Sequence, residues 1–177
     1  MQDCWASAAL SGDWTEREER CRGARGRTVV DFSALGPKTV RSILVDTGPL
    51  YAMADQDDAW HDRVRAFLDT ARVLLVVPVT VLPEACYLIG THLGASAEVQ
   101  FARSVQRGEV KVEFLKKEDL ARTVEVMEKY LDANLGFVDA SLVALAERLK
   151  IREILTTDRR HFSLVRPRHC SSFTVRP

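Results

Sequence analysis

The sequence has no excess charge of either sign. Its 177 residues include 25 Lys and Arg residues and 25 Asp and Glu residues, so it lacks the bulk positive charge with which histone-like proteins coat nucleic acid. This balance does not exclude an enzyme that handles nucleic acid at a small local site. The apolar fraction of 46% excludes whole-chain disorder and fibrous structure, and the length suits one compact domain.

The sequence also lacks the motifs of several common sites. Neither G-x-x-x-x-G-K-[ST] nor G-x-G-x-x-G occurs, so phosphate cradles for nucleoside triphosphates and dinucleotides are unsupported. Without G-x-S-x-G, covalent acyl chemistry has no visible nucleophile. The four cysteines form no C-x-x-C pair, which in a chain of this length indicates reduced thiols in a reducing compartment.

Neither a signal peptide nor a transmembrane segment is predicted. Residues 6–10 are too short an apolar run for a signal peptide, and Asp3 stands where positive charge is expected. The longest apolar stretch, residues 71–90, contains two prolines and Glu84, and a buried carboxylate would be costly in lipid. We therefore expect a cytoplasmic protein that has no membrane partner.

Residues 1–41 differ in character from the rest of the chain. They have no sustained apolar period, and they carry charge clusters and scattered glycines. We expect an N-terminal extension that is disordered or lies upstream of the true start codon. The alternative is a short ordered arm in which Val29, Val30 and Phe32 pack against the domain. The domain itself is expected at residues 42–177.

From residue 43 onward, runs typical of strands and of helices alternate. Strands are predicted at 43–45, 73–79, 110–115, 153–156 and 172–176, and helices at 58–71, 80–93, 96–106, 116–131 and 138–149. This alternation predicts an α/β fold, a three-layer α/β/α sandwich with a mainly parallel sheet of four to five strands.

Three local patterns carry more specific expectations. Gly48 and Pro49 directly after the first strand predict a turn. The run 73–79 is apolar throughout, which predicts a strand buried on both faces. The helix predicted at 116–131 is amphipathic, with an apolar side made of Leu120, Val124, Met127 and Leu131.

Four acidic residues from distant parts of the chain are predicted at the ends of elements. They are Asp46 after the first strand, Glu84 and Asp139 in the first turns of two helices, and Asp158 after the fourth strand. Ligands bind at the carboxyl ends of parallel strands, so we expect these side chains at one edge of the sheet. Carboxylates in one site raise each other's pKa unless cations neutralise them, and Mg²⁺ or Mn²⁺ suits oxygen ligands.

The same acids also have structural interpretations. Asp46 could form an Asx turn, Asp139 could favour a helix N-terminus, and Asp158 could cap a turn. Glu84 is harder to explain in this way, because it lies one residue too far along its helix for a capping box and has apolar neighbours.

The acids stand in motifs that resemble those of the PIN-domain ribonucleases. In chain order the motifs are ILVDTGPLYAMAD, PVTVLPEACYLI, LGFVDASLVALAERL and ILTTDRRHF. The resemblance covers about residues 43–177 and is greatest to the VapC-like toxins of type II toxin–antitoxin pairs. It says nothing about residues 1–41.

This resemblance implies a PIN-like fold, a site and a chemistry. It implies a catalytic and metal-binding quartet made of Asp46, Glu84, Asp139 and Asp158. Asp46 and Asp139 would be the direct ligands of Mg²⁺ or Mn²⁺, and the neighbouring Thr47 and Thr157 would support the quartet. The reaction would be hydrolysis of RNA phosphodiester bonds by a metal-activated water.

The resemblance also implies partners. VapC-like toxins are homodimers, and each is neutralised by a small antitoxin whose C-terminal segment lies over the active-site groove. The apolar helices predicted at 80–93 and 138–149 are candidate faces for the dimer or the antitoxin, or they are core.

The end of the chain is locally basic. Residues 159–177 contain two histidines, no acid and five arginines, which are Arg159, Arg160, Arg166, Arg168 and Arg176. Because they follow Asp158 directly, Arg159, Arg160 and His161 are candidate contacts for the phosphates that flank the scissile bond. The alternative is a solvated basic tail.

Two other functions remain as alternatives. A non-catalytic PIN-fold module that binds RNA or protein would share the fold, although the intact quartet argues against it. A receiver-like phosphorylation switch would need an acidic pair after the first strand, a phospho-acceptor Asp after the third and a Lys near the last. Here the third strand ends in Leu115, Lys116 and Lys117, and the last strand has no Lys.

Overall fold

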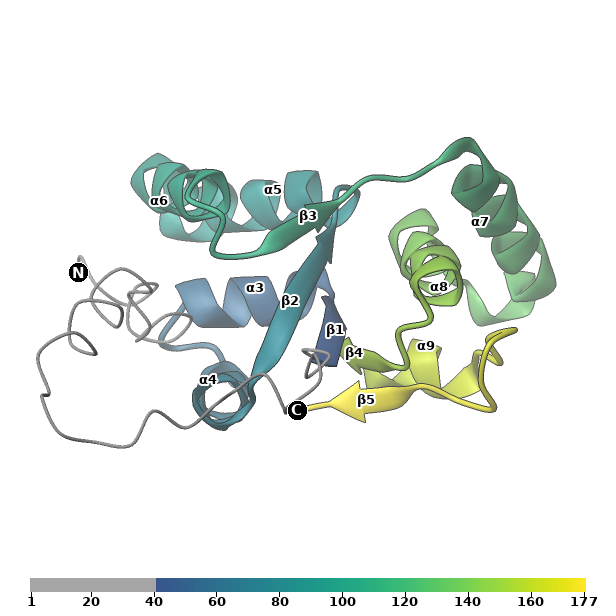
Figure 1. Cartoon of the computed structure of the whole chain (residues 1–177). Coiled ribbons are helices and arrows are strands. Elements are labelled where there is room, and N and C mark those ends of the chain that lie inside the picture. The colour runs from purple at the N-terminus through teal and green to yellow at the C-terminus, as the bar shows by residue number, and fades with distance from the viewer. Residues whose placement is uncertain (1–40) are drawn as a thin grey trace, which may run out of the picture.

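The computed structural model describes residues 41–177, which form a sheet covered by helices on both faces (Figure 1). The five strands are parallel and lie in the order β3-β2-β1-β4-β5. Their bounds are β1 Arg41–Val45, β2 Val73–Pro78, β3 Lys111–Glu113, β4 Glu153–Leu155 and β5 Thr174–Arg176. The predictions for residues 1–41 lie outside the described residues, except at Arg41, which begins β1.

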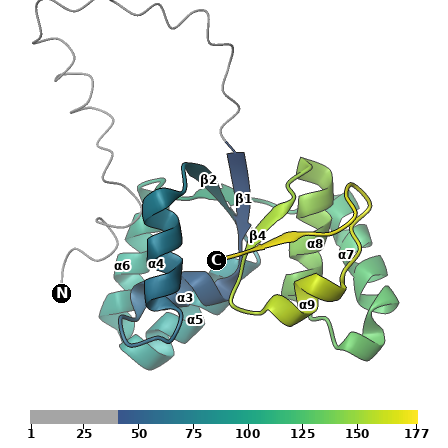
Figure 2. The same ribbon diagram turned by 90° about the horizontal axis from the view of Figure 1, so that it is seen from below.

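Two groups of helices enclose the sheet, one on each face (Figures 1 and 2). On one face are α3 Thr47–Ala54, α4 His61–Thr70, α5 Val81–Leu93 and α6 Ala95–Gln106. On the other are α7 Lys117–Lys129, the short 3-10 helix η2 Leu131–Ala133, α8 Phe137–Leu149 and α9 Arg159–Leu164. The predicted α/β fold with a parallel sheet is confirmed. None of the described helices combines the length and apolar character needed to cross a bilayer.

The central strand β1 is the point at which the strand order reverses. Along the chain the sheet grows from β1 through β2 to β3 on one side, and later from β4 to β5 on the other. Leu44 is paired with Val76 of β2 and with Ile154 of β4. In open parallel sheets the crevice at such a reversal is the usual ligand site, and here it lies at the carboxyl ends of β1 and β4.

The segment that follows β1 is a helix, so the turn predicted there is wrong. Asp46 is the N-cap of α3, and its Oδ1 accepts a 2.7 Å hydrogen bond from the Thr47 amide. Pro49 falls in the first turn, where proline is tolerated because the helix leaves its first amides without partners. The helix α9, which the sequence did not predict, likewise begins after the N-cap Asp158.

The strand β2 is buried only in its second half, which corrects the expectation of burial along its whole length. Val76, Val77 and Pro78 are buried, whereas the side chain of Leu74 is 40% exposed. The short strand β3 pairs with β2 only along the buried residues, so the first half of β2 has a neighbouring strand on one side only among the described residues.

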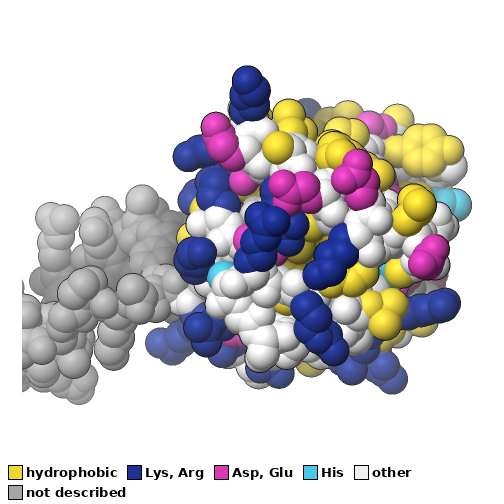
Figure 3. All heavy atoms as spheres, turned by 90° about the vertical axis from the view of Figure 1, so that its right-hand side faces the viewer, with side chains coloured by type: hydrophobic (Ala, Val, Ile, Leu, Met, Phe, Trp, Pro, Cys, Tyr) yellow, Lys and Arg dark blue, Asp and Glu magenta, His cyan; other side chains and the backbone are white. Residues whose placement is uncertain are grey.

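The predicted apolar side of α7 faces the core only in part, because Met127 packs against the core while the other three residues are exposed. The exposed residues on it are Leu120 (44%), Val124 (51%) and, just beyond the helix, Leu131 (76%). Figure 3 shows hydrophobic side chains among charged ones on this part of the surface. The buried side of α7 carries Val126 of the core together with ion pairs to α8: Arg148 Nε is 2.8 Å from Asp119, and Arg122 Nε is 2.8 Å from Glu147. Apolar packing and polar pairing therefore both hold α7 in place.

Candidate active site

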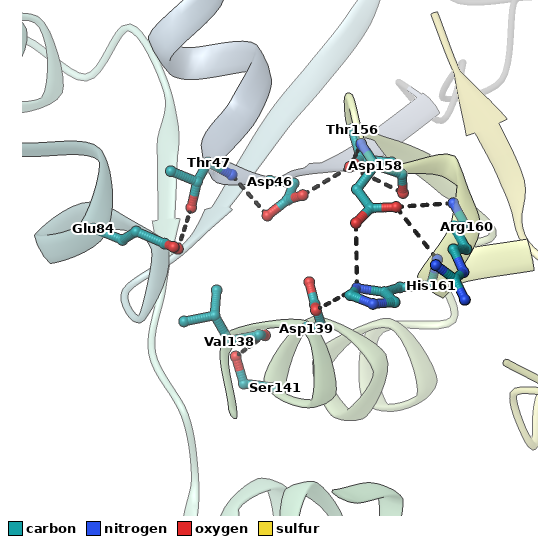
Figure 4. Close-up of polar contacts among 10 residues, drawn as sticks. All are labelled: Asp46, Thr47, Glu84, Val138, Asp139, Ser141, Thr156, Asp158, Arg160 and His161. Atoms are coloured by element: carbon teal, nitrogen blue, oxygen red, sulfur yellow. Dashed lines mark hydrogen bonds and ion pairs between the residues drawn. The ribbon is translucent and has the colours of Figure 1, made fainter. Parts of the chain in front are cut away.

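The four acids predicted from the sequence lie at one edge of the sheet, where β1 and β4 end (Figure 4). They come from both helical layers and from the sheet between them. Asp46 and Asp158 are N-caps of the helices that follow β1 and β4, and Glu84 and Asp139 lie in the first turns of α5 and α8. The fold thus brings together carboxylates that are up to 112 residues apart in the sequence.

Asp46 is the buried member of this quartet, with 7% of its surface exposed. Its Oδ1 accepts a hydrogen bond from the Thr47 amide and its Oδ2 accepts one from the Thr156 hydroxyl, each of 2.7 Å. Burial raises the pKa of Asp46 from 3.8 to about 6; the two hydrogen bonds oppose this rise, and the charges of Asp139 and Glu84 add to it. Since both donors are neutral, they do not balance the charge of the ionised carboxylate.

Thr156, which the sequence analysis did not single out, contacts two acids of the quartet. It is fully buried, donates to Asp46, and accepts a 2.9 Å hydrogen bond from the Asp158 amide. Thr157, the predicted supporting residue, faces Gly48 instead, where an added methyl group would lie 2.0 Å from its Oγ1. No alternating pattern distinguishes the two threonines, because β4 is buried on both faces. The register of β1 and β4 pairs the residues just before Asp46 and Thr156. This register determines that Thr156, and not Thr157, lies beside Asp46.

Thr47, the other predicted supporting residue, contacts Glu84. Its hydroxyl donates a 2.6 Å hydrogen bond to Glu84 Oε2. The flanking residues Val81 and Ala85 of α5 are buried, while Glu84 itself is exposed. The Glu84 side chain therefore extends from α5 toward β1, where the residue after Asp46 holds it.

His161 lies between the other two acids. Its Nδ1 is 3.0 Å from Asp139 Oδ2 and 3.4 Å from Asp158 Oδ2. Burial raises the pKa of Asp139; the contact with His161 opposes the rise, and the charges of Asp158 and Glu84 add to it. Asp158 also accepts hydrogen bonds through Oδ1 from the amides of Arg160 (2.9 Å) and His161 (3.4 Å). The imidazole thus contacts the quartet directly.

The basic C-terminal stretch is built into α9 and β5 rather than forming a solvated tail. Two of its arginines form ion pairs with other elements, Arg168 with Glu125 (2.7 Å) and Arg176 with Glu153 (3.4 Å). Arg159 donates to the carbonyl of Pro177. Arg160 is exposed next to Asp158 (Figure 4), so it is the arginine best placed to meet a ligand of the quartet.

The ligand atoms that the quartet offers are of the type that a hard divalent cation binds. All are carboxylate oxygens, which Mg²⁺ and Mn²⁺ prefer, and a cation would offset the mutual repulsion that raises the pKa of Asp46 and Asp139 in addition to burial. As the described side chains are arranged, no three Asp, Glu, His or Cys residues are placed to hold one ion. Glu84 and Asp158 are exposed, so their carboxylates can change rotamer without a backbone movement.

Comparison with known proteins identifies the family of this chain. Residues 43–166 match the PIN domain family. Ribonuclease VapC26 of Mycobacterium tuberculosis is 35% identical over 135 residues, which are 76% of this chain and 100% of that protein. The crystal structure of Mycobacterium tuberculosis VapC20, described as a sarcin-ricin loop cleaving toxin, covers 67% of this chain and 92% of its own, with a TM-score of 0.63 and 22% identity. At that identity the structural likeness supports the fold alone. The family match and the identity to VapC26 show that the chain belongs to the PIN-domain family, as a homologue of the VapC ribonuclease toxins.

Proposed function

We propose that the chain is a Mg²⁺- or Mn²⁺-dependent endoribonuclease and the toxin of a toxin–antitoxin pair. The observation that carries the proposal is the buried Asp46 carboxylate, whose pKa of about 6 is held up by burial and by neighbouring acids, with only neutral donors bound to it. A carboxylate in such a setting gains most from a cation. The membership of the PIN-domain family and the identity to a VapC ribonuclease support the same chemistry.

In this proposal Asp46 and Asp139 are the direct metal ligands, and Glu84 and Asp158 complete the site from its exposed sides. When bound, the metal ion supplies an activated water and stabilises the charge that develops on the phosphate. Thr156 holds Asp46 in place through its hydroxyl group, and His161 does the same for Asp139 through Nδ1.

The RNA backbone would lie along α9. Arg160 is exposed beside Asp158, and the start of α9 adds Arg159 and His161 to the same edge. These side chains would contact the phosphates on either side of the scissile bond, since arginine binds phosphate oxygens well. The ion pairs of Arg168 and Arg176 leave those two residues less suited to the task.

The partners of the proposed toxin are a second copy of the chain and a small antitoxin. The support is the identity to VapC26 and the family motifs, and on this basis we place the protein in the cytoplasm. Growth arrest on expression in a bacterial host, relieved by Asp139→Asn or by a small protein encoded next to the gene, would support the toxin assignment. Expression without any effect on growth would count against it.

The enzymatic part of the proposal is tested by RNA cleavage with the purified full chain. We expect end-labelled RNA to be cut in the presence of Mn²⁺ or Mg²⁺, and EDTA to stop the reaction. Asp139→Asn should abolish cleavage, whereas the matched change Asp62→Asn, at an exposed acid of α4, should leave it intact. Equal cleavage by wild type and Asp139→Asn would refute the site. RNA binding without cleavage by the wild type would favour the non-catalytic PIN-fold module.

A further inference from the structure

Two side-chain hydroxyl groups join the start of α5 to the start of α8. Thr80 Oγ1, just before α5, lies 2.7 Å from Ser141 Oγ in α8. Ser141 is fully buried, and its hydroxyl also donates a 2.7 Å hydrogen bond to the carbonyl of Val138. Because a hydroxyl group has one hydrogen and a carbonyl can only accept, Thr80 must be the donor to Ser141. Thr80 and Ser141 are called the hydroxyl pair below.

The hydroxyl pair is a direct side-chain link between the two helical layers. The helix α5 packs mainly against α3 and α6, and α8 packs mainly against α7, on opposite faces of the sheet (Figure 1). Both helices also contact β2, so this strand sets their approximate separation. The bond between Thr80 and Ser141 adds a direct constraint between the two helix starts.

Each of these helix starts carries one acid of the quartet. Glu84 lies four residues after Thr80, and Asp139 lies two residues before Ser141; Figure 4 shows Glu84, Asp139 and Ser141. Hydrogen bonds aim both carboxylates at the same site: the Thr47 hydroxyl, next to Asp46, holds Glu84, and His161 holds Asp139. A shift of either helix start would therefore change the distance between the two carboxylates.

We propose that Thr80 and Ser141 are positioning residues of the carboxylate site, and that their hydrogen bond sets the separation between Glu84 and Asp139. The inference rests on the proposed metal-dependent function. Neither hydroxyl group is a ligand or touches the substrate; they act by holding α5 and α8 in register. Residues that hydrogen-bond a metal ligand directly contribute about 10- to 100-fold to metal affinity or activity, and because Thr80 and Ser141 act one step further away, we expect an effect of about 10-fold or less.

The test is a Mn²⁺ titration of the full chain, measured together with the melting temperature. Thr80→Val removes the hydroxyl group while keeping the shape of the side chain, and we expect it to weaken Mn²⁺ binding by about 3- to 10-fold. Thr80→Ser keeps the hydroxyl group and should restore affinity to near the wild-type value. Should Thr80→Val fail to fold, Ser141→Ala removes the same bond from α8 and carries the same expectation.

A matched control variant distinguishes a specific loss of Mn²⁺ affinity from a general loss of stability. Thr123→Val in α7 also removes a fully buried threonine hydroxyl, which donates 2.8 Å to the carbonyl of Asp119, and it lies in a helix that carries no acid of the quartet. It should lower the melting temperature and leave Mn²⁺ affinity unchanged. Wild-type affinity in Thr80→Val, or an equal loss in Thr123→Val, would overturn the inference alone. A wild-type chain that bound no Mn²⁺ would overturn the proposed function and the inference with it.

Discussion

Replacing Asp46 by asparagine is expected to stabilise the metal-free protein at pH 8, even though it removes a proposed catalytic residue. The pKa of Asp46 rises from 3.8 to about 6 on folding, mainly through burial. A carboxyl group of this kind contributes stability that is fully present below pH 3.8 and is lost as the pH rises through about 6. At pH 8 the folded wild type therefore carries the full cost of a buried charge, about 3 kcal/mol for a pKa shift of this size.

The asparagine variant avoids this cost but disturbs one hydrogen bond. The Thr47 amide can still donate to the side-chain oxygen, whereas the amide nitrogen at the second position cannot accept from Thr156. The hydroxyl group of Thr156 would have to turn toward the carbonyl of Asp158, which is 3.5 Å away, at a cost of about 1 kcal/mol. The net gain is about 2 kcal/mol, or a rise in melting temperature of roughly 4–8 °C for a chain of this size.

The assay is thermal unfolding of wild type and Asp46→Asn in EDTA between pH 4 and pH 8. The difference between the two proteins should grow as the pH rises through about 6, and it should reverse when saturating Mn²⁺ stabilises only the wild type. A variant that is less stable than wild type at pH 8 without metal, or a difference that does not depend on pH, would refute the reasoning.

Three further predictions concern the support of Asp46, the ion pairs that hold α7, and the pH dependence of metal binding. Thr156→Val should lower stability by about 1–3 kcal/mol, because it leaves the Asp158 amide and the Oδ2 atom of Asp46 without a partner, whereas Thr157→Val should change stability little; urea unfolding compares the two. Arg148→Met should cost about 3 kcal/mol, because its partner Asp119 has only 4% of its side chain exposed, whereas Arg168→Met breaks an exposed pair and should cost less than about 1 kcal/mol; equal costs in denaturant would contradict this. The Mn²⁺ affinity of the wild type should fall as the pH drops through about 6, since the metal competes with the proton on Asp46; a titration at pH 5 and pH 7.5 checks it.

The acids of the site could be found from the sequence because each stands at the boundary of a clear element. Asp46 ends an apolar strand, and Asp139 opens a helix rich in Ala and Leu, so the alternation of strands and helices was enough to bring them to one edge. The helix α3 was missed because Gly48 and Pro49 usually mark a turn. The helix start is capped by the bond from the Thr47 amide to Asp46, which depends on the rotamer of a single side chain.

The contacts that support the acids of the site could not be predicted from sequence patterns. The choice between Thr156 and Thr157 depends on strand register, and the bond between Thr80 and Ser141 joins residues 61 positions apart across the sheet. The exposed apolar side of α7 was also not foreseeable, because a helix is oriented by all of its contacts. In this case α7 buries Val126 and pairs Asp119 with Arg148, while Leu120 and Val124 stay exposed.

The most direct test of the metal-dependent site is the position of a bound ion in a crystal of the full chain grown with Mn²⁺. We predict an anomalous-scattering peak between the carboxylates of Asp46 and Asp139, with Glu84 or Asp158 turned toward it. Crystals in saturating Mn²⁺ that showed no peak at these carboxylates, or an ion held by other residues, would contradict it.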